Sequence, residues 1–333
     1  MLALALAGCE GAGPGTPPGA SPAIDASATA KQPPPPDAGA AAPDPARQAA
    51  LAIGDTSDES PLRRAAFAPD PAFFSTLPPP GDGDWLSVHN EPAQSFERYR
   101  LAPGNRVNDR RKRLYLQPIG SAYQNRTIRV RHFQRFLAAY FGLEVVVLPA
   151  RDAGDFARSA REAPWGLQLQ TPAVFAALRA KLPSDAYGVI GITGIDLYPN
   201  DSFNFVFGQA TFADRLGVLS INRFTDPKDG KSPSTAVIRK RALTLAAHEI
   251  GHMFGLPHCR YYQCVMNGSN GLSETDRSPL HLCPVCLRKL DYVARLKLLD
   301  RTRRLAKELA ALGLPEQARW HRRRAKALGP KTK

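Results

Sequence analysis

The chain has 333 residues, of which 43% are hydrophobic, so it is long and apolar enough to build one large domain or two ordinary ones. It contains no run of about 18 apolar residues, which excludes a membrane-spanning helix. The net charge of +14 is local: residues 288–333 hold 15 basic and 4 acidic side chains and account for +11 of it. The rest of the chain is close to neutral.

The first cysteine, Cys9, lies in the sequence Leu-Ala-Gly-Cys, which resembles the lipobox of bacterial lipoproteins. On this resemblance residues 1–9 are the remnant of a signal peptide and Cys9 is the lipidation site. The protein would then be anchored to a membrane in the cell envelope, facing away from the cytoplasm. Only eight residues precede Cys9, and none is Lys or Arg. Either the natural start lies further upstream, or the match is chance and the protein is cytoplasmic.

The segment that follows is rich in Ala, Pro and Gly, with ten prolines between Glu10 and Pro45. Such a composition cannot bury enough apolar surface to fold. We expect residues 10–70 to form a disordered tether, or, without a lipid, an ordinary disordered N-terminus. Residues 71–107 mix Pro/Gly-rich pieces with apolar anchors such as Trp85, which predicts an arm packed on a catalytic domain.

Regular elements begin near residue 111. Apolar runs predict strands at 114–116, 143–148, 187–192 and 215–221. Helical spacing predicts a helix over 128–141, ended by Gly142, and another opened by Thr171-Pro172, with the threonine hydroxyl as its cap. A third helix is opened by Ser232-Pro233 and runs to about residue 254. Strands that alternate with helices indicate an α/β domain with a mixed sheet over residues 108–300.

The last of these helices carries a metal-binding pattern. His248 and His252 are four residues apart, so they share one helical face, and Glu249 reaches the same region. Gly255 can adopt a left-handed conformation that ends the helix and brings His258 back as a third ligand. Three neutral histidines leave one position open, which is typical of a catalytic zinc site. Glu249 would serve as general base in the hydrolysis of a peptide bond.

Eight residues after the third histidine stands Met266, in the position of a methionine turn beneath the metal. The run HExxHxxGxxHC, continued by a cysteine, Met266 and the motif CPVC, resembles the signature of the archaemetzincins, a branch of the metzincin zinc peptidases. Similarity extends over about residues 80–310, through the segments DLY and NFVFG upstream and CLRKL downstream.

This resemblance implies a zincin-like fold with a mixed sheet, an active-site helix and a small C-terminal subdomain that carries the methionine turn. It implies a zinc metallopeptidase that acts on peptides or proteins, and an aminopeptidase in some members. In such folds the substrate lies along an edge strand above the zinc, for which residues 203–208 are our candidate. These residues are equally compatible with an ordinary sheet strand.

Four cysteines, Cys259, Cys264, Cys283 and Cys286, fall within 28 residues. Their spacing suits a tetrahedral zinc, and the resemblance implies a second, structural zinc bound there, which makes two zinc ions per chain. In an oxidising compartment the same cysteines could instead form disulfides, or the CxxC pair could act in redox chemistry.

Residues 301–333 form a basic tail in which leucines recur among Arg and Lys, which predicts amphipathic helix docked on the domain. Its charge indicates a solvated face, or else attraction to anionic headgroups if the protein is lipid-anchored. No reader motif accompanies the charge, so we expect no nucleic acid partner. The sequence does not indicate an oligomeric state. The four remaining histidines have no ligand spacing and are interpreted as structural or surface residues.

Two other functional classes compete with the peptidase. One is a peptide-binding protein on a metallopeptidase fold with little turnover. The other is a redox or scaffold module built around the four cysteines.

Overall fold

The computed structural model describes residues 3–7, 44–101, 105–120, 127–225 and 231–330. The α-helices in these residues are α1 (Pro45–Leu51), α2 (Pro61–Phe67), α3 (Trp85–Val88), α4 (Phe96–Leu101), α5 (Val130–Phe141), α6 (Thr171–Arg179), α7 (Thr235–Met253), α8 (Leu272–Arg277), α9 (Pro284–Ala294), α10 (Leu298–Ala311) and α11 (Pro315–Leu328). The strands are β1 (Ala3–Ala7), β2 (Arg113–Ile119), β3 (Glu144–Val147), β4 (Arg161–Ala163), β5 (Gly166–Gln170), β6 (Ala186–Thr193), β7 (Asp196–Tyr198), β8 (Val206–Thr211) and β9 (Leu216–Ser220).

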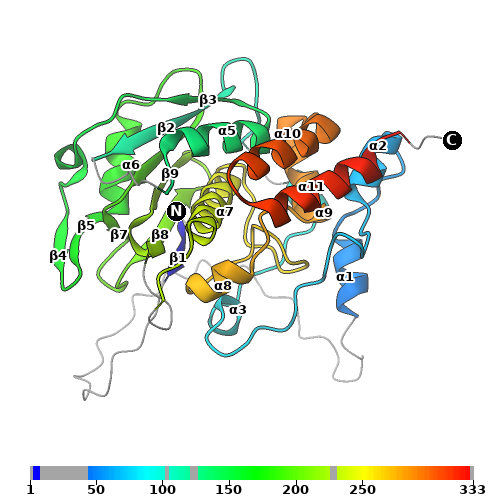
Figure 1. The fold of residues 1–333 in the computed structure, drawn as a ribbon, viewed down its shortest axis with the longest axis horizontal. Coiled ribbons are helices and arrows are strands. Elements are labelled where there is room, and N and C mark those ends of the chain that lie inside the picture. Colours follow the sequence, from blue (N-terminus) through cyan, green and yellow to red (C-terminus); the bar gives the residue numbers. More distant parts are fainter. Residues whose placement is uncertain (1–2, 8–43, 102–104, 121–126, 226–230, 331–333) are drawn as a thin grey trace.

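These strands form a single twisted sheet (Figure 1) in the order β3-β2-β6-β9-β8-β7-β5-β4, with β1 paired to β8. The pairs β3/β2, β2/β6, β6/β9 and β5/β7 are parallel, whereas β9/β8, β8/β7, β4/β5 and β1/β8 are antiparallel. The predicted mixed sheet is therefore confirmed. The central strands β6 and β9 are buried along their whole length, as expected for strands covered on both faces.

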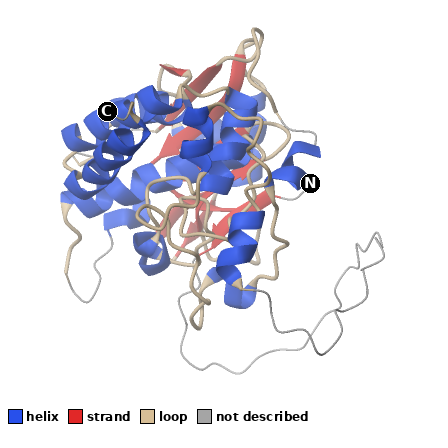
Figure 2. Cartoon of the chain, turned by 90° about the vertical axis from the view of Figure 1, so that its right-hand side faces the viewer, coloured by secondary structure: helices blue, strands red, loops and turns tan. Residues whose placement is uncertain are grey.

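Helices cover both faces of the sheet. The larger core joins α5, α7, α9 and the C-terminal helices to one face, through buried residues such as Phe136, Leu245 and Leu290. A smaller core on the opposite face holds α6, through Val174 and Leu178. Figure 2, turned by 90° from Figure 1, shows helices in front with the strands partly visible behind them. The helix that carries the HExxH motif, α7, thus runs within the main core.

The predicted helices form, but the cap of α6 and the start of α7 differ from the prediction. Gly142 ends α5 in the left-handed conformation, with φ of 69°, as predicted. The hydroxyl of Thr171, however, does not cap α6. It hydrogen-bonds the side chain of buried Gln209 on β8 instead, so a tertiary partner displaces the local one. For α7 the cap is Ser234, whose side chain accepts from the backbone of Val237, so this helix begins two residues later than Ser232-Pro233 suggests.

The N-terminal boundary also needs correction. We expected a disordered tether over 10–70, but residues from Asp44 onward are ordered as α1 and α2. The small side chains of Ala49 and Ala66 are fully buried there, and Phe67 is 1% exposed. Arg63 of α2 forms an ion pair of 2.8 Å with Asp291 of α9, which ties this segment to the domain. Cys9 and residues 10–43 lie outside the described residues.

The candidate substrate strand is displaced from its predicted position. The strand β8 begins at Val206, not at Phe203, because the backbone carbonyls of Phe203 and Asn204 accept hydrogen bonds from the side chain of Arg161. Nor is β8 a free edge. It pairs with β9 on one side, and it also pairs with β7 at its first residue and with β1 between its first and last residues.

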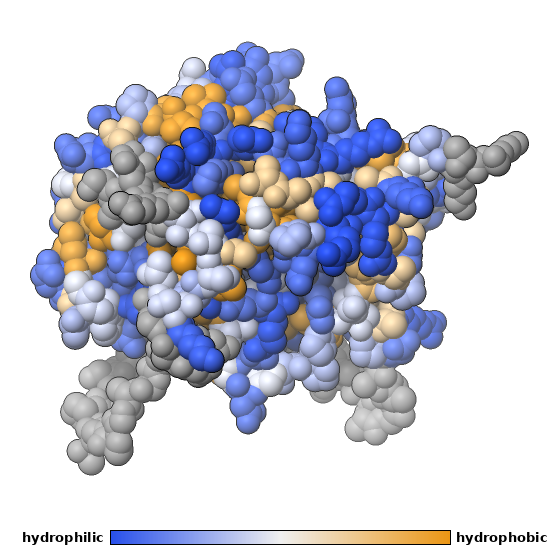
Figure 3. All heavy atoms as spheres, viewed as in Figure 1, coloured by the Kyte–Doolittle hydropathy of each residue, from blue (hydrophilic) through white to orange (hydrophobic). Residues whose placement is uncertain are grey.

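The basic tail is two helices that pack on the domain rather than a free segment. Leu305, Leu309 and Ala318 are buried in the main core, and α10 contacts α5. Figure 3 shows strongly hydrophilic side chains over this region. The exposed basic residues of the two helices are Arg303, Arg304, Lys307, Arg319, Arg322, Arg323 and Lys326. No helix in the described part of the chain is long and apolar enough to cross a membrane.

Candidate metal centre

Three histidines converge at the end of α7. His248 and His252 lie one turn apart, and their Nε2 atoms are 3.0 Å from each other. Gly255, with φ of 79°, turns the chain after the helix, a conformation that glycine adopts without steric cost. The turn returns His258, so that one ring nitrogen from each histidine lies within 4.8 Å of the others. All three side chains are buried, and the predicted ligand set is brought together.

In two of these rings, the hydrogen bond of the outer nitrogen, Nδ1, determines which tautomer the ring adopts. The Nδ1 of His248 lies 2.8 Å from the carbonyl oxygen of Val265, and the Nδ1 of His252 lies 2.7 Å from that of Leu256. A carbonyl can only accept, so each Nδ1 carries the proton. Burial lowers the pKa of His248 to about 3 and lowers that of His252 well below its usual value, so both rings are neutral.

Two neutral rings protonated at Nδ1 present only lone pairs at Nε2. Lone pairs 3.0 Å apart repel each other and cannot form a hydrogen bond. The Nε2 of His258 is likewise buried and has no hydrogen-bond partner within the described residues. Three convergent lone pairs fit a divalent cation, and imidazole is a common ligand of zinc.

Glu249 lies beside this centre, and its carboxyl group has no polar partner in the described part of the chain. Its side chain is 1% exposed, and neither carboxylate oxygen has a hydrogen-bond partner in the described part of the chain. Burial raises the pKa of Glu249 well above its usual value, while a cation at the histidines would act in the opposite direction. Its carboxylate faces the backbone of β8 at Gly208, where a Cβ atom would lie 2.9 Å from Oε1.

Met266 lies under the histidine helix. It is fully buried, and its sulfur packs on the backbone of Gly251, between the two helical histidines, where a side chain would collide with it. The carbonyl of Met266 accepts from the amide of Cys259 at 2.7 Å. Asn267 closes the turn by donating to the carbonyl of Cys259 at 2.7 Å and accepting from the amide of Cys264 at 2.7 Å.

The four clustered cysteines are buried free thiols whose sulfur atoms lie within 4.8 Å of one another. The Sγ atoms of Cys259 and Cys283 are 3.6 Å apart. Four sulfurs around zinc at about 2.3 Å would be separated by about 3.8 Å, so this spacing fits a tetrahedral tetrathiolate site. The backbone amide of Cys283 points at the sulfur of Cys264 at 3.3 Å, a contact that favours thiolates at the start of α9.

Residues of the N-terminal arm contact the third histidine of the centre. The carboxylate of Glu91 lies 2.8 and 3.0 Å from the Nδ1 of His258. The ring of Trp85 contacts the ring of His258 edge-on at a centroid distance of 5.0 Å and stacks on His89 at 3.8 Å. The sequence analysis treated Trp85 as an apolar anchor inside the region of family similarity, and it did not find Glu91. One glutamate in an irregular segment, 167 residues before its partner, has no spacing that could have signalled it.

The chain is similar to known proteins over most of its length. The sequence model of Peptidase family M54 matches residues 175–292. Archaemetzincin-2 of mouse is 35% identical over 285 residues, which covers 75% of this chain and 78% of that protein. The chain is an archaemetzincin. It is therefore a zinc-dependent peptidase, and the family assignment from sequence is confirmed.

Further archaemetzincins are similar to this chain. Archaemetzincin-2 of human is 35% identical over 281 residues, covering 75% of this chain and 78% of that protein. Archaemetzincin-1 of mouse is 34% identical over 75% of this chain and 57% of that protein. Among solved structures, an archaemetzincin from Methanopyrus kandleri aligns with a TM-score of 0.43 at 27% identity, covering 59% of this chain and 99% of that structure.

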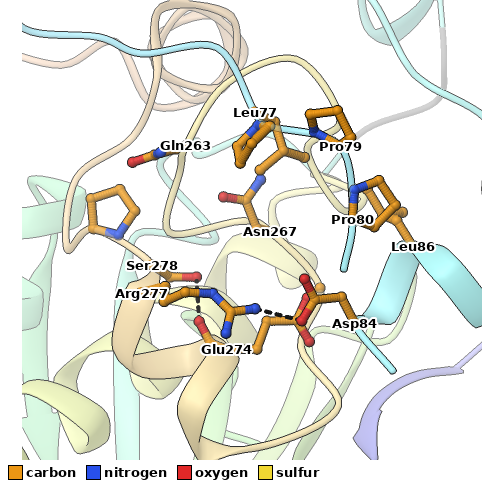
Figure 4. Close-up of a pocket in the computed structure, with 13 residues that line it drawn as sticks. Leu77, Pro79, Pro80, Asp84, Leu86, Gln263, Asn267, Glu274, Arg277 and Ser278 are labelled. Carbon is orange, nitrogen blue, oxygen red and sulfur yellow. Dashed lines mark hydrogen bonds and ion pairs between the residues drawn. The ribbon is translucent and has the colours of Figure 1, made fainter. Parts of the chain in front are cut away.

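The M54 model spans the histidines and all four clustered cysteines of this archaemetzincin but begins after the arm that carries Trp85 and Glu91. That arm is fastened to the methionine turn and to α8 around a pocket (Figure 4), lined by Leu77, Pro78, Pro79, Pro80, Asp84, Leu86, Gln263, Asn267, Gly268, Glu274, Arg277, Ser278 and Pro279. Arg277 of α8 pairs with Asp84 of the arm along one wall of the pocket. None of the seven clustered histidines and cysteines lines it.

Proposed function

We propose that His248, His252 and His258 hold a catalytic zinc and that Glu249 is the general base of peptide hydrolysis. The observation that carries this proposal is the convergence of three unmatched Nε2 lone pairs beside an unpaired, buried carboxylate. Zinc bound there would lower the pKa of a bound water and polarise the substrate carbonyl.

The chain's own residues would then handle the proton. Glu249 is held close to the centre by α7 and by the backbone of Gly208, so it can accept a proton from the attacking water. The same carboxyl group can deliver that proton to the leaving amine. Because burial raises its pKa and a cation would lower it, the pKa of Glu249 is drawn toward the range in which one group can do both.

We further propose that the substrate binds as an extended strand along the outer side of β8. The antiparallel pairing of β1 with Ala210 and Gln209 supports this, because β1 is an extended chain on that side of the strand, and a substrate would bind there in place of β1. Gly208 is the third of the six residues of β8, so a paired peptide would extend to both sides of Glu249. This favours cleavage within a peptide, and removal of N-terminal residues is the alternative that the family resemblance raised.

Profiling with matched peptides separates these modes. The zinc-loaded protein is incubated with a peptide library in free and N-acetylated forms, and the products are identified by mass spectrometry. Cleavage of acetylated peptides at internal bonds supports strand binding and endopeptidase action. Cleavage confined to the first bond of peptides with a free amino terminus would reject endopeptidase action and indicate an aminopeptidase.

For the four cysteines we propose a structural zinc rather than disulfides. Two buried cations support it: Lys289 of α9 is 3% exposed and Arg301 is 7% exposed, and within the described residues neither lies in ion-pair distance of a carboxylate. Lys289 follows Cys286 by about one helical turn, and Arg301 and Cys286 both lie within electrostatic range of the buried hydroxyl of Tyr140. A zinc tetrathiolate carries a charge of −2 and would balance both cations, whereas two disulfides are neutral.

Metal and thiol analysis tests this second site. The proposal predicts two zinc ions per chain and four thiols in the cluster that become titratable only after denaturation with a chelator. One zinc ion per chain and no titratable thiols in the cluster would contradict it.

We also propose that Cys9 carries a lipid and that the protein resides in the cell envelope. The lipobox-like sequence before Cys9 supports this, and the exposed basic face of α10 and α11 would add attraction to anionic headgroups. Fractionation of cells that express the parent and a Cys9→Ala variant tests it. The parent should be in the membrane fraction and the variant outside it, and equal distribution would contradict lipidation.

A further inference from the structure

The three histidines of the centre are not held alike. The outer nitrogens of His248 and His252 bond to backbone carbonyls at 2.8 and 2.7 Å, within the loop that follows α7. The outer nitrogen of His258 instead bonds to a carboxylate, that of Glu91, from a segment distant in sequence. Only the third ligand therefore has an acidic partner among the described residues.

This contact is partly shielded from water. The side chain of His258 is 1% exposed and that of Glu91 is 20% exposed. Both carboxylate oxygens of Glu91 lie within hydrogen-bond distance of Nδ1, and a carboxylate accepts hydrogen bonds, so Nδ1 of His258 carries the proton that Glu91 accepts.

The arm that carries Glu91 is fixed at several points. The carbonyl of Glu91 accepts a hydrogen bond from the guanidinium of Arg260, two residues after His258. Upstream, the backbone amide of Trp85 donates to both oxygens of Glu274 at 3.1 Å. Figure 4 shows the neighbouring contact, in which Arg277 reaches across to Asp84. Contacts at Glu91 itself and upstream of it at Trp85 thus hold the Glu91 side chain beside His258.

We propose that Glu91 is a positioning residue for the third zinc ligand, so that the N-terminal arm completes a centre whose ligands all lie elsewhere in the chain. By accepting the Nδ1 proton, Glu91 fixes the tautomer in which the Nε2 of His258 presents its lone pair to the other two histidines. Its negative charge makes the imidazole a stronger donor toward a cation. This inference rests on the catalytic zinc proposed above, and it adds a residue that neither the histidine motif nor the M54 match contains.

The test compares zinc affinity in three variants of the full chain. Glu91→Ala removes both the acceptor and the charge, and Glu91→Gln keeps an acceptor at nearly the same volume. Glu97→Gln is the matched control, because Glu97 is in the same arm but pairs with Arg100 on the exposed side of α4. Zinc release is followed by chelator competition, with melting temperature and the count of retained metal ions as checks on folding.

We expect Glu91→Ala to weaken binding of the histidine-held zinc by about 10- to 100-fold. Glu91→Gln should recover part of this loss, and Glu97→Gln should match the parent. In the cobalt-substituted protein, the visible absorption of the histidine-held ion should change in the Glu91 variants, while the sulfur-to-metal bands remain. A folded Glu91→Ala variant that binds zinc within about twofold of the parent would overturn the proposal.

Two further outcomes also decide against it. If Glu91→Gln and Glu91→Ala both melt at lower temperature and lose both metals together, Glu91 has only a structural role. If a His248→Ala variant retains the metal content of the parent, the three histidines do not hold a zinc ion. That result would reject the proposed function itself, and with it the role of Glu91.

Discussion

Replacement of Gly208 by alanine should impair catalysis without removing metal. A Cβ atom at this position would lie 2.9 Å from Oε1, 3.0 Å from Cγ and 3.1 Å from Cδ of Glu249. Carbon atoms in contact are normally about 3.5–4.0 Å apart, so the carboxylate or the strand must shift by about 0.5–1 Å. The strand cannot yield freely, because Gly208 is paired with Leu219 of β9.

A displacement of about 1 Å at a reacting group can reduce the rate by about 100-fold. We therefore expect Gly208→Ala to lower kcat/KM by about 10- to 100-fold, which corresponds to about 1.4–2.7 kcal/mol of lost transition-state stabilisation. Zinc content should equal that of the parent, because the proposed zinc ligands are the three histidines and Glu249 is not a ligand.

The assay is hydrolysis of a fluorogenic peptide selected from the library, with zinc measured in the same sample. The control is Gly154→Ala, because a Cβ atom there meets nothing within 4 Å. A zinc-loaded Gly208→Ala variant that retains activity within about twofold of the parent would refute the placement of the general base against β8.

Two other perturbations test the metal sites and the helical packing. Cys283→Ser should remove one of two zinc ions and lower the free energy of unfolding by about 4 kcal/mol or more, as expected for loss of a structural metal, and retention of both ions in metal analysis would contradict it. His321 of α11 is 2% exposed, and burial holds its pKa well below the usual value. The unfolded chain therefore binds more protons at this residue below about pH 6.5, and its contribution to stability is lost as pH falls, by at most about 1.4 kcal/mol per pH unit. His321→Phe should flatten this dependence in denaturant titrations between pH 7 and pH 4, and an unchanged slope would exclude His321 as a cause.

The parts of this protein that sequence predicts well are those set by local spacing. His248, His252 and Gly255 act through one helix and its end, so their pattern is readable without the fold. The central strands and α5 are also predicted from sequence. The strands have continuous apolar runs, and α5 has apolar residues at helical spacing and ends at Gly142.

The parts that sequence misses depend on distant partners. Composition indicates disorder for 44–70, yet Ala49 and Phe67 are buried because other helices supply the surface that covers them. Thr171 satisfies the local rule for a cap, but Gln209 on β8 competes for its hydroxyl. Glu91 is invisible in sequence for the same reason, since its role exists only once His258 lies beside it.

We propose above that Glu249 performs proton transfer at a zinc held by the three histidines. The most direct measurement compares peptide hydrolysis by the zinc-loaded parent and by a Glu249→Gln variant, with the zinc content of both determined. We expect unchanged zinc content and a loss of about 10²- to 10⁴-fold in kcat for the variant. Equal rates in a fully zinc-loaded Glu249→Gln variant would contradict it.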